Sequence, residues 1–287
     1  MIPLRDNIPS RSFPVVNVTM IAACGLVFLG QLMEPPDNAT IVERFGMIPA
    51  RVLHPSQTIE IPVAQEETGQ YERRRLPSGE VVQVPVVRTV TRPAAPSGVP
   101  AALTLLTCIF LHGGWMHFLG NMWFLWIFGD NVEDRFGHFG YLLFYIAAGV
   151  AASLTHLASA PGSTIPTIGA SGAIAGVMGA YLVSYPHARV QALIPLGFIM
   201  EMMVIPAPIF LGIWMLMQLF QGVSSISSVE TTGVAWWAHI GGFAAGAAAA
   251  WLLDKVHFLR PRNTNIRPGT DHATMYRLGR GPGPDRF

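Results

Sequence analysis

A serine and a histidine that lie far apart in the chain both stand at the start of an apolar, glycine-rich run. Ser171 is flanked by Gly169, Ala170 and Gly172 at a point where a loop is expected to meet a helix. There the serine would adjoin the free N–H groups of a first helical turn. His239 begins a later run, and a serine beside a neutral histidine is the minimum requirement for nucleophilic catalysis. We therefore predict Ser171 as the nucleophile and His239 as its general base.

Both residues also have structural interpretations that the sequence leaves open. The spacing Gly172-x-x-x-Gly176 is typical of close helix packing, and serine commonly forms hydrogen bonds between membrane helices. The histidine could instead bond a loop carbonyl. However, Gly242 and Gly246 give the histidine's run the same small-residue spacing. The two runs are therefore expected to pack together and to bring the serine and the histidine to a similar depth.

Two further polar side chains, His117 and Asn121, are spaced to lie on one face of a helix that begins after Gly113 and Gly114. Both can donate hydrogen bonds. Together with the backbone N–H of Ser171 they could surround the oxyanion of a tetrahedral intermediate, where each donor is worth about 3–4 kcal/mol in a serine protease. The alternatives are a helix–helix hydrogen bond for Asn121 and an interfacial contact for His117.

Metal, cofactor and other intramembrane chemistries find little support in the sequence. It contains no His-Glu-x-x-His motif of the kind that zinc proteases use, and no pair of aspartates lies inside the apolar runs. Cys24 and Cys108 offer neither a disulfide framework nor metal-ligand spacing. We expect no cofactor and no metal, and the net charge of +1 gives no indication of nucleic-acid binding.

These side chains are set in a chain with the composition of a membrane protein. Hydrophobic residues make up 51% of the 287, and charged residues only 12%, about half the charged share of a soluble protein. Apolar runs lie at 15–33, 104–128, 138–158, 171–185, 204–221 and 235–253, most of them near the roughly 20 residues that a spanning helix needs. The fourth run is short, so its start at Ser171 is expected to lie below the membrane surface beside a cavity or within protein.

Six spans would place both chain ends on one side of the membrane. Basic residues outnumber acidic ones after residue 253, and the positive-inside rule places that side in the cytoplasm. We expect a cytoplasmic N-terminus (1–14), a first transmembrane helix (15–33), a long extracytoplasmic loop (34–103), a core of five further helices (104–253) and a basic, disordered cytoplasmic tail (254–287). Alternating valines in 81–87 suggest a hairpin within the long loop.

From about residue 103 to residue 253 the sequence resembles the rhomboid intramembrane serine proteases. Four ordered motifs carry the resemblance: Leu111-His112-Gly113-Gly114-Trp115-Met116-His117 leading to Asn121, Asn131-Val132-Glu133-Asp134-Arg135-Phe136-Gly137, Gly169-Ala170-Ser171-Gly172, and Ala238-His239-Ile240-Gly241-Gly242. The resemblance implies an all-α integral membrane fold, a six-transmembrane-helix bundle with a water-filled cavity open to the outer side. It also implies a Ser171–His239 dyad without an acidic third member, an oxyanion site at His117 and Asn121, and no cofactor. Structural roles are implied for Glu133, Arg135, Gly169, Gly172 and Gly242.

The implied activity is cleavage, within the lipid bilayer, of membrane proteins that have a spanning helix, and we expect a bacterial inner membrane as the location.

Many family members carry an aromatic residue one turn after the serine, which stacks on the histidine; here that position is Ala175. Inactive relatives typically lose the serine or histidine, or place proline before the serine, whereas this chain has Ala170 there. A binding protein that holds a helix uncut and a transporter are the other classes considered, and the sequence offers a transporter no inverted repeat.

Overall fold

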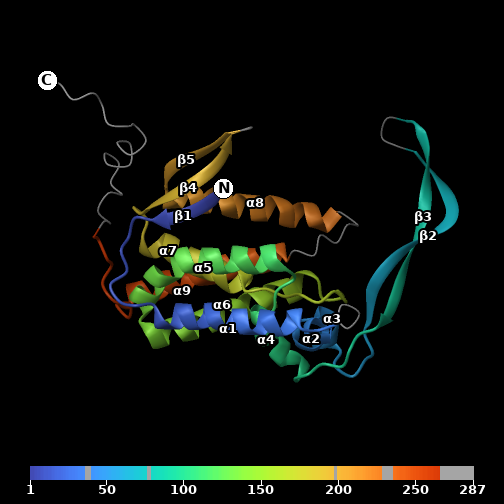
Figure 1. The fold of residues 1–287 in the computed structure, drawn as a ribbon, viewed down its shortest axis with the longest axis horizontal. Coiled ribbons are helices and arrows are strands. Elements are labelled where there is room, and N and C mark those ends of the chain that lie inside the picture. The colour runs from blue at the N-terminus through green and yellow to red at the C-terminus, as the bar shows by residue number, and fades with distance from the viewer. Residues whose placement is uncertain (36–39, 76–78, 197–198, 228–234, 266–287) are drawn as a thin grey trace.

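Six helices form the body of the described part of the protein, and each one overlaps a predicted apolar run. The computed structural model describes residues 1–35, 40–75, 79–196, 199–227 and 235–265. The helices lie side by side along the longest dimension of the molecule (Figure 1). They are α1 (Val15–Leu32), α5 (Trp115–Phe136), α6 (His138–Ser159), α7 (Ser171–Ser184), α8 (Ala207–Ser227) and α9 (Trp236–Lys255).

Length and hydropathy identify membrane spans among these helices, but fewer than six. Within the described residues, α1, α6 and the Ala207–Ser224 part of α8 are each long and apolar enough to cross a bilayer. A fourth span results if α5 is joined to the segment Ala101–Phe110, from which it is bent by 80°. Large apolar side chains such as Leu26 and Phe220 are exposed on the outside of the bundle, as lipid contact requires.

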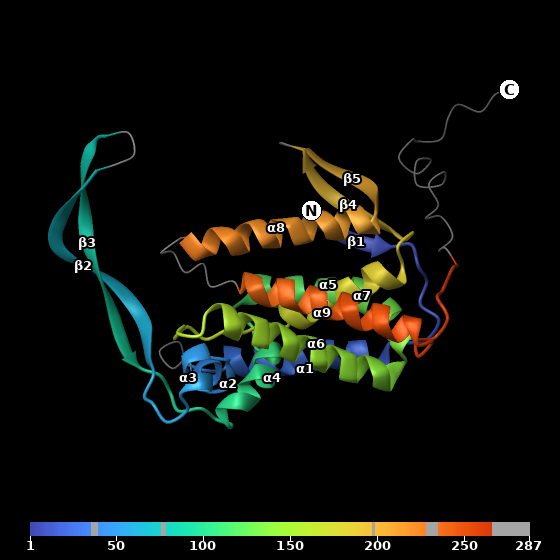
Figure 2. The same ribbon diagram turned by 180° about the vertical axis from the view of Figure 1, so that it is seen from behind.

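Helix α7 is short and lies inside the bundle, where nearly all of its side chains are buried. Its contact with α9 is made by glycines: a Cβ atom at Gly242 would overlap the carbonyl oxygen of Gly172, and one at Gly246 would overlap that of Gly176. The predicted close packing of these two helices is confirmed. Figure 2 shows α5, α7 and α9 as a middle layer, with α1 and α6 on one side and α8 on the other.

The all-α expectation is wrong in one respect, because the protein also contains two antiparallel sheets. Strands β1 (Ile2–Asp6), β4 (Arg189–Leu196) and β5 (Ile199–Pro206) form a sheet in the order β1-β4-β5. The β4–β5 stretch is apolar and rich in branched side chains, and window hydropathy does not distinguish such a strand from a helix. The run predicted at 204–221 therefore starts in β5, which passes directly into α8.

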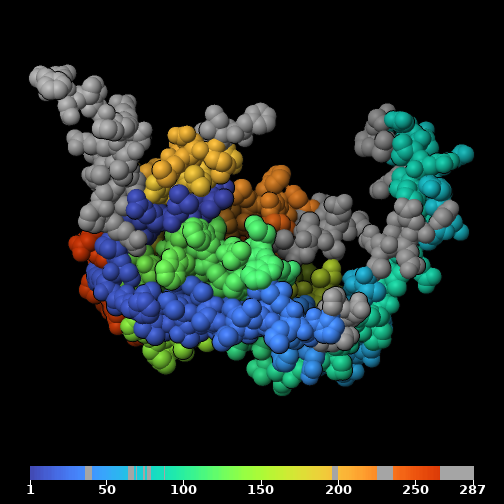
Figure 3. Space-filling model, viewed as in Figure 1, coloured from blue at the N-terminus to red at the C-terminus, as the bar shows by residue number. Residues whose placement is uncertain are grey.

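The long segment 34–103 contains the predicted hairpin. Strands β2 (Glu60–Arg75) and β3 (Val81–Pro93) pair along most of their length. In Figure 3 the hairpin rises from the edge of the helical body. Short helices lie on either side of it in the sequence, namely α2 (Thr40–Phe45), α3 (Pro49–Leu53), the 3-10 turns Ala101–Leu103 and Cys108–Phe110, and α4 (Thr104–Thr107) between those turns.

Part of the segment 254–287, which is expected to be a disordered tail, lies within the described residues. The Arg260 N–H donates to the carbonyl of Arg135, and the guanidinium of Arg11 donates to the carbonyls of Pro261 and Arg262. These bonds tie residues 254–265 to α5 and to the N-terminal segment. The expectation for 266–287 falls outside the described residues.

Candidate active site

Ser171 and His239 meet where helices α7 and α9 begin. The Oγ atom of Ser171, the first residue of α7, lies 2.8 Å from Nε2 of His239, which is in the first turn of α9. The glycine contacts described above set the distance between α7 and α9, so they also set the distance between Ser171 and His239. The histidine is only 9% exposed. A serine hydroxyl within hydrogen-bonding distance of a largely buried imidazole is the geometry that transfer of the serine proton requires.

Helix α8 contacts the His239 ring on the side away from Ser171. Oε1 of Gln218 lies 2.7 Å from Nδ1 of His239, and Gln218 is itself 7% exposed. The ring of Trp214, one turn earlier on α8, lies with its centroid 5.9 Å from that of His239 at an interplanar angle of 37°. Trp236 contacts the imidazole edge-on from within α9. The imidazole is therefore contacted on several sides, with a hydrogen-bond partner at each nitrogen.

A cavity of about 520 Å³ opens beside the serine and the histidine. Side chains of α5, α7, α8 and α9 line it. They include His117, Asn121, Ser171, Trp214, Gln218 and His239. All four residues predicted to carry or support the chemistry thus face one cavity.

His117 and Asn121 both line this cavity, and both side chains carry hydrogen-bond donors. The Nδ2 atom of Asn121 is buried and has no hydrogen-bond partner among the described residues. His117 accepts at Nδ1 from the backbone N–H of Gly113, 3.3 Å away. A neutral imidazole that accepts at Nδ1 carries its proton on Nε2, and this nitrogen lies against Gly169, beside the serine.

Gly169 has a conformation and surroundings that a larger residue would not fit. Its φ angle is +127°, and a Cβ atom there would lie 2.7 Å from Nε2 of His117. The loop that contains it is fixed at two points just before α7: the Gly169 N–H donates to the carbonyl of Cys108, and Thr167 pairs with Met47 in an antiparallel bridge. Part of segment 34–103 therefore supports the loop that precedes Ser171.

Glu133 and Arg135 lie near the other end of α5, away from the serine. The Glu133 carboxylate accepts from the backbone N–H groups of Val16 and Asn17, at 3.0 and 2.8 Å, and so satisfies the free donors at the start of α1. Arg135 forms an ion pair with Asp254 at the end of α9. These contacts connect α5 to the ends of two other helices.

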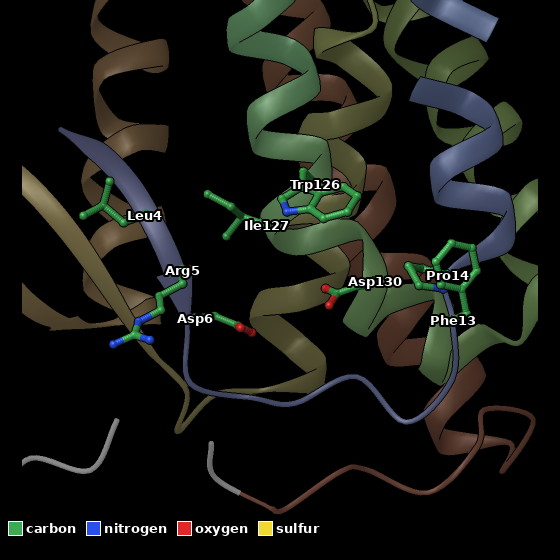
Figure 4. A pocket seen from close by; sticks show the side chains of 8 residues that line it. All are labelled: Leu4, Arg5, Asp6, Phe13, Pro14, Trp126, Ile127 and Asp130. Atoms are coloured by element: carbon green, nitrogen blue, oxygen red, sulfur yellow. The ribbon is translucent and has the colours of Figure 1, made fainter. Parts of the chain in front are cut away.

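A second cavity, of about 250 Å³, lies at the β1 end of the bundle and is shown in Figure 4. Its two carboxylates take part in structural contacts: Asp6 accepts from Asn131 and Tyr181, and Asp130 accepts from the Asn131 backbone N–H. None of the predicted site residues lines this cavity. No group of three or more His, Cys, Asp or Glu side chains in the described part of the chain is placed to hold a metal ion.

The contacts around the site were only partly predictable from sequence. Gln218 and Trp214 were not identified, because each is a common residue near the end or the surface of a membrane helix. Their i, i+4 spacing on a helix that follows Pro206 was the available signal. Which side of α8 faces His239 depends on the packing of three helices.

Comparison with known proteins agrees with the resemblance of the motifs. A family model described as the rhomboid domain matches residues 100–255, more than half of the chain. The match includes α5 to α9 and therefore all the residues that line the larger cavity. The chain belongs to the rhomboid family of membrane proteins.

Individual relatives come from plants, bacteria and yeast. The chain is 31% identical over 160 residues to Rhomboid-like protein 11, chloroplastic, of Arabidopsis thaliana, an alignment that covers 54% of each protein. It is 35% identical over 153 residues to Rhomboid protease GluP of Bacillus subtilis (strain 168), which covers 53% of this chain and 26% of GluP. It is 26% identical over 170 residues to Rhomboid protein 1, mitochondrial, of Saccharomyces cerevisiae, with 55% and 43% covered. The matched region is thus about half or less of each relative, and the relatives are not confined to bacterial inner membranes.

Proposed function

We propose that this protein is an intramembrane serine endopeptidase that cleaves membrane proteins with a spanning helix. The observation that supports this most strongly is the 2.8 Å contact between Ser171 Oγ and His239 Nε2, next to a cavity that also contains the unpartnered amide of Asn121. A relative that matches the same region of the chain is named as a protease. We further propose that α1 and α5 to α9 together form the membrane-embedded bundle.

In the proposed reaction, the Ser171 oxygen attacks the carbonyl carbon of the scissile peptide bond while its proton passes to Nε2 of His239. The negative charge that develops on the carbonyl oxygen is stabilised by hydrogen bonds from His117, Asn121 and the Ser171 backbone N–H. The C–N bond then breaks as His239 returns the proton to the leaving amine. Water repeats the sequence on the acyl-enzyme and releases the second product.

The proposed substrate is a helix that has locally lost its helical structure. In an intact helix every backbone carbonyl before the last turn is hydrogen-bonded within the helix. Ser171 lies at the buried start of α7, so the substrate segment must enter the cavity in an extended form. The short length of α7, only 14 residues, is consistent with a nucleophile that lies below the membrane surface.

The test is cleavage of a single-span model substrate, with the substrate and the full chain together in lipid vesicles. We expect the wild-type chain to produce two fragments and expect Ser171→Ala and His239→Ala to produce none, with the melting temperature unchanged. If the chain instead binds a helix without cutting it, the substrate will stay intact in all three samples. That result would contradict the proposal.

A further inference from the structure

The His239 imidazole has two possible neutral forms, and only one of them can remove a proton from Ser171. Nε2 must be unprotonated to accept the serine proton, so the ring proton has to be on Nδ1. The proposed dyad contains no acidic residue that would select this form. Whatever bonds to Nδ1 therefore decides whether the histidine can act as a base.

In this protein the group at Nδ1 is the side-chain oxygen of Gln218, at 2.7 Å. A carboxamide oxygen only accepts hydrogen bonds, so Nδ1 must be the donor, and the ring proton is held there. If the amide nitrogen faced the ring instead, it would donate to Nδ1, and the ring proton would be on Nε2. The histidine would then donate to Ser171, and the pair would be unable to begin the reaction.

We propose that Gln218 is a positioning residue that selects the reactive tautomer of His239 and fixes the orientation of its ring. The proposal rests on the function proposed above and extends it: the site is a serine, a histidine and a neutral glutamine, contributed by α7, α9 and α8. Gln218 does not touch the serine oxygen, so it acts through the histidine.

Trp214 completes the support of the ring from the same helix. It lies one turn before Gln218, so both side chains are on one face of α8. Its ring contacts that of His239, while the position one turn after the serine in α7 is Ala175, which is too small to stack. Helix α8 thus supplies both the hydrogen bond that sets the tautomer and the aromatic contact that limits tilting of the ring.

A direct test measures the tautomer itself. The full chain, with ¹⁵N-labelled histidine, is studied in detergent micelles by two-bond ¹H–¹⁵N spectra, and the His239 signals are assigned by their loss in His239→Gln. We expect protonated Nδ1 and unprotonated Nε2 in the wild type. We expect Gln218→Met, which keeps the length of the side chain and removes the amide, to show the Nε2-protonated form as well. Gln221→Met, a change at an exposed glutamine of the same helix, should match the wild type.

The kinetic test uses the same variants with the model substrate. Gln218→Met should lower kcat roughly 10- to 100-fold, the size of loss seen for groups that orient metal-binding histidines, with KM and the melting temperature unchanged. Gln218→Glu, which retains an acceptor oxygen, should recover most of that loss.

Two results would overturn the role of Gln218: an Nε2-protonated ring in the wild type, or a Gln218→Met variant with an unchanged tautomer or an unchanged kcat. Because the spectra do not depend on turnover, they decide the tautomer even if the wild-type chain cleaves nothing. Absence of cleavage by the wild type would instead contradict the proposed function.

Discussion

Asn121 is the side chain whose surroundings bear most directly on the proposed chemistry. A buried amide without a partner costs about 1–3 kcal/mol, so a folded protein keeps one only where something else offsets the cost. The Asn121 Nδ2 atom has no hydrogen-bond partner among the described residues, and Asn121 lines the same cavity as Ser171. An oxyanion that forms in the cavity during the reaction would supply the missing acceptor.

We therefore expect Asn121→Ala to reduce kcat for the model substrate by about 10²-fold or more, the usual effect of removing one oxyanion donor. The melting temperature should stay the same or rise slightly, because the change removes an unsatisfied buried group. His117→Ala should show the same pattern. If activity and melting temperature fell together in both variants, the two residues would be structural and the oxyanion site would have to be elsewhere.

Ala175 provides a prediction about packing at the same site. The side chain is fully buried one turn after Ser171, and Trp214 already contacts the His239 ring from α8. We expect Ala175→Phe to overpack this region at a cost of about 1–3 kcal/mol, seen as a lower melting temperature together with lower activity. Ala175→Ser, a small change, serves as the control for size. A Phe variant with full stability and higher activity would show that space for a stacking ring exists on α7.

The sequence identified four of the side chains around the cavity but not the two from α8. Ser171, His239, His117 and Asn121 occur in motifs with glycines at fixed spacing, and such motifs are visible in a single chain. Gln218 and Trp214 have no motif. Their role depends on the rotation of α8 about its own axis, which is set by packing against α7 and α9 rather than by local sequence.

At the level of elements, the features that depend on local backbone chemistry were predictable. The start of α5 follows Gly113 and Gly114, and Gly114 has a φ angle of +149° that other residues rarely adopt. The sheet formed by β1, β4 and β5 was not predictable in the same way. It joins residues near 5 and near 191, and a pairing over that distance leaves no periodic signal beyond a short apolar run.

The segment 34–103 is held together by one buried carboxylate. Glu43 on α2 is 3% exposed and accepts hydrogen bonds from the guanidinium of Arg92 on β3, at 2.7 and 3.1 Å, and from the Ala95 N–H. Burial acts to raise the pKa of Glu43, but the hydrogen bonds from Arg92 and Ala95 outweigh it, so its pKa lies below the ordinary value. The ionised form is therefore the one that the folded segment favours.

The sign of this shift gives a pH prediction. A lowered pKa contributes stability above the ordinary pKa of glutamate, about 4.3, and this contribution is lost as the pH falls through the lower pKa of the folded form. We expect limited proteolysis within residues 40–100 to be slow near neutral pH and faster in acid. Glu43→Gln should be cleaved faster than the wild type near neutral pH and should respond less to acid. Equal cleavage of both proteins at every pH would contradict the proposed role of Glu43.

At the scale of the whole molecule, the hairpin and the loop that leads into α7 lie toward one end of the bundle. The β1 sheet and residues 254–265 lie at the other end (Figure 1). The bridge between Met47 and Thr167 connects the hairpin's segment to the loop before Ser171. The basic residues between positions 254 and 265 belong to the opposite end. If that end faces the cytoplasm, the cavity opens on the outer side of the membrane.

This orientation can be tested in intact cells that express variants of the chain, each with one cysteine added to the two native ones. We expect cysteines placed between residues 79 and 92 to react with a membrane-impermeant thiol reagent added from outside. Cysteines placed after Arg260 should react only after the cells are opened. The native Cys24 and Cys108 are both buried and serve as an internal control. Labelling of the tail from outside would reverse the orientation.

The measurement that tests the central claim most directly is covalent labelling by a fluorophosphonate, which reacts with a serine hydroxyl that a histidine has activated. With the detergent-solubilised full chain, we predict one adduct per molecule, located on Ser171 by mass spectrometry of the digested protein. We predict no adduct in Ser171→Ala and strongly reduced labelling in His239→Ala. An adduct on a different serine, or equal labelling of the wild type and Ser171→Ala, would contradict the assignment of Ser171 as the nucleophile.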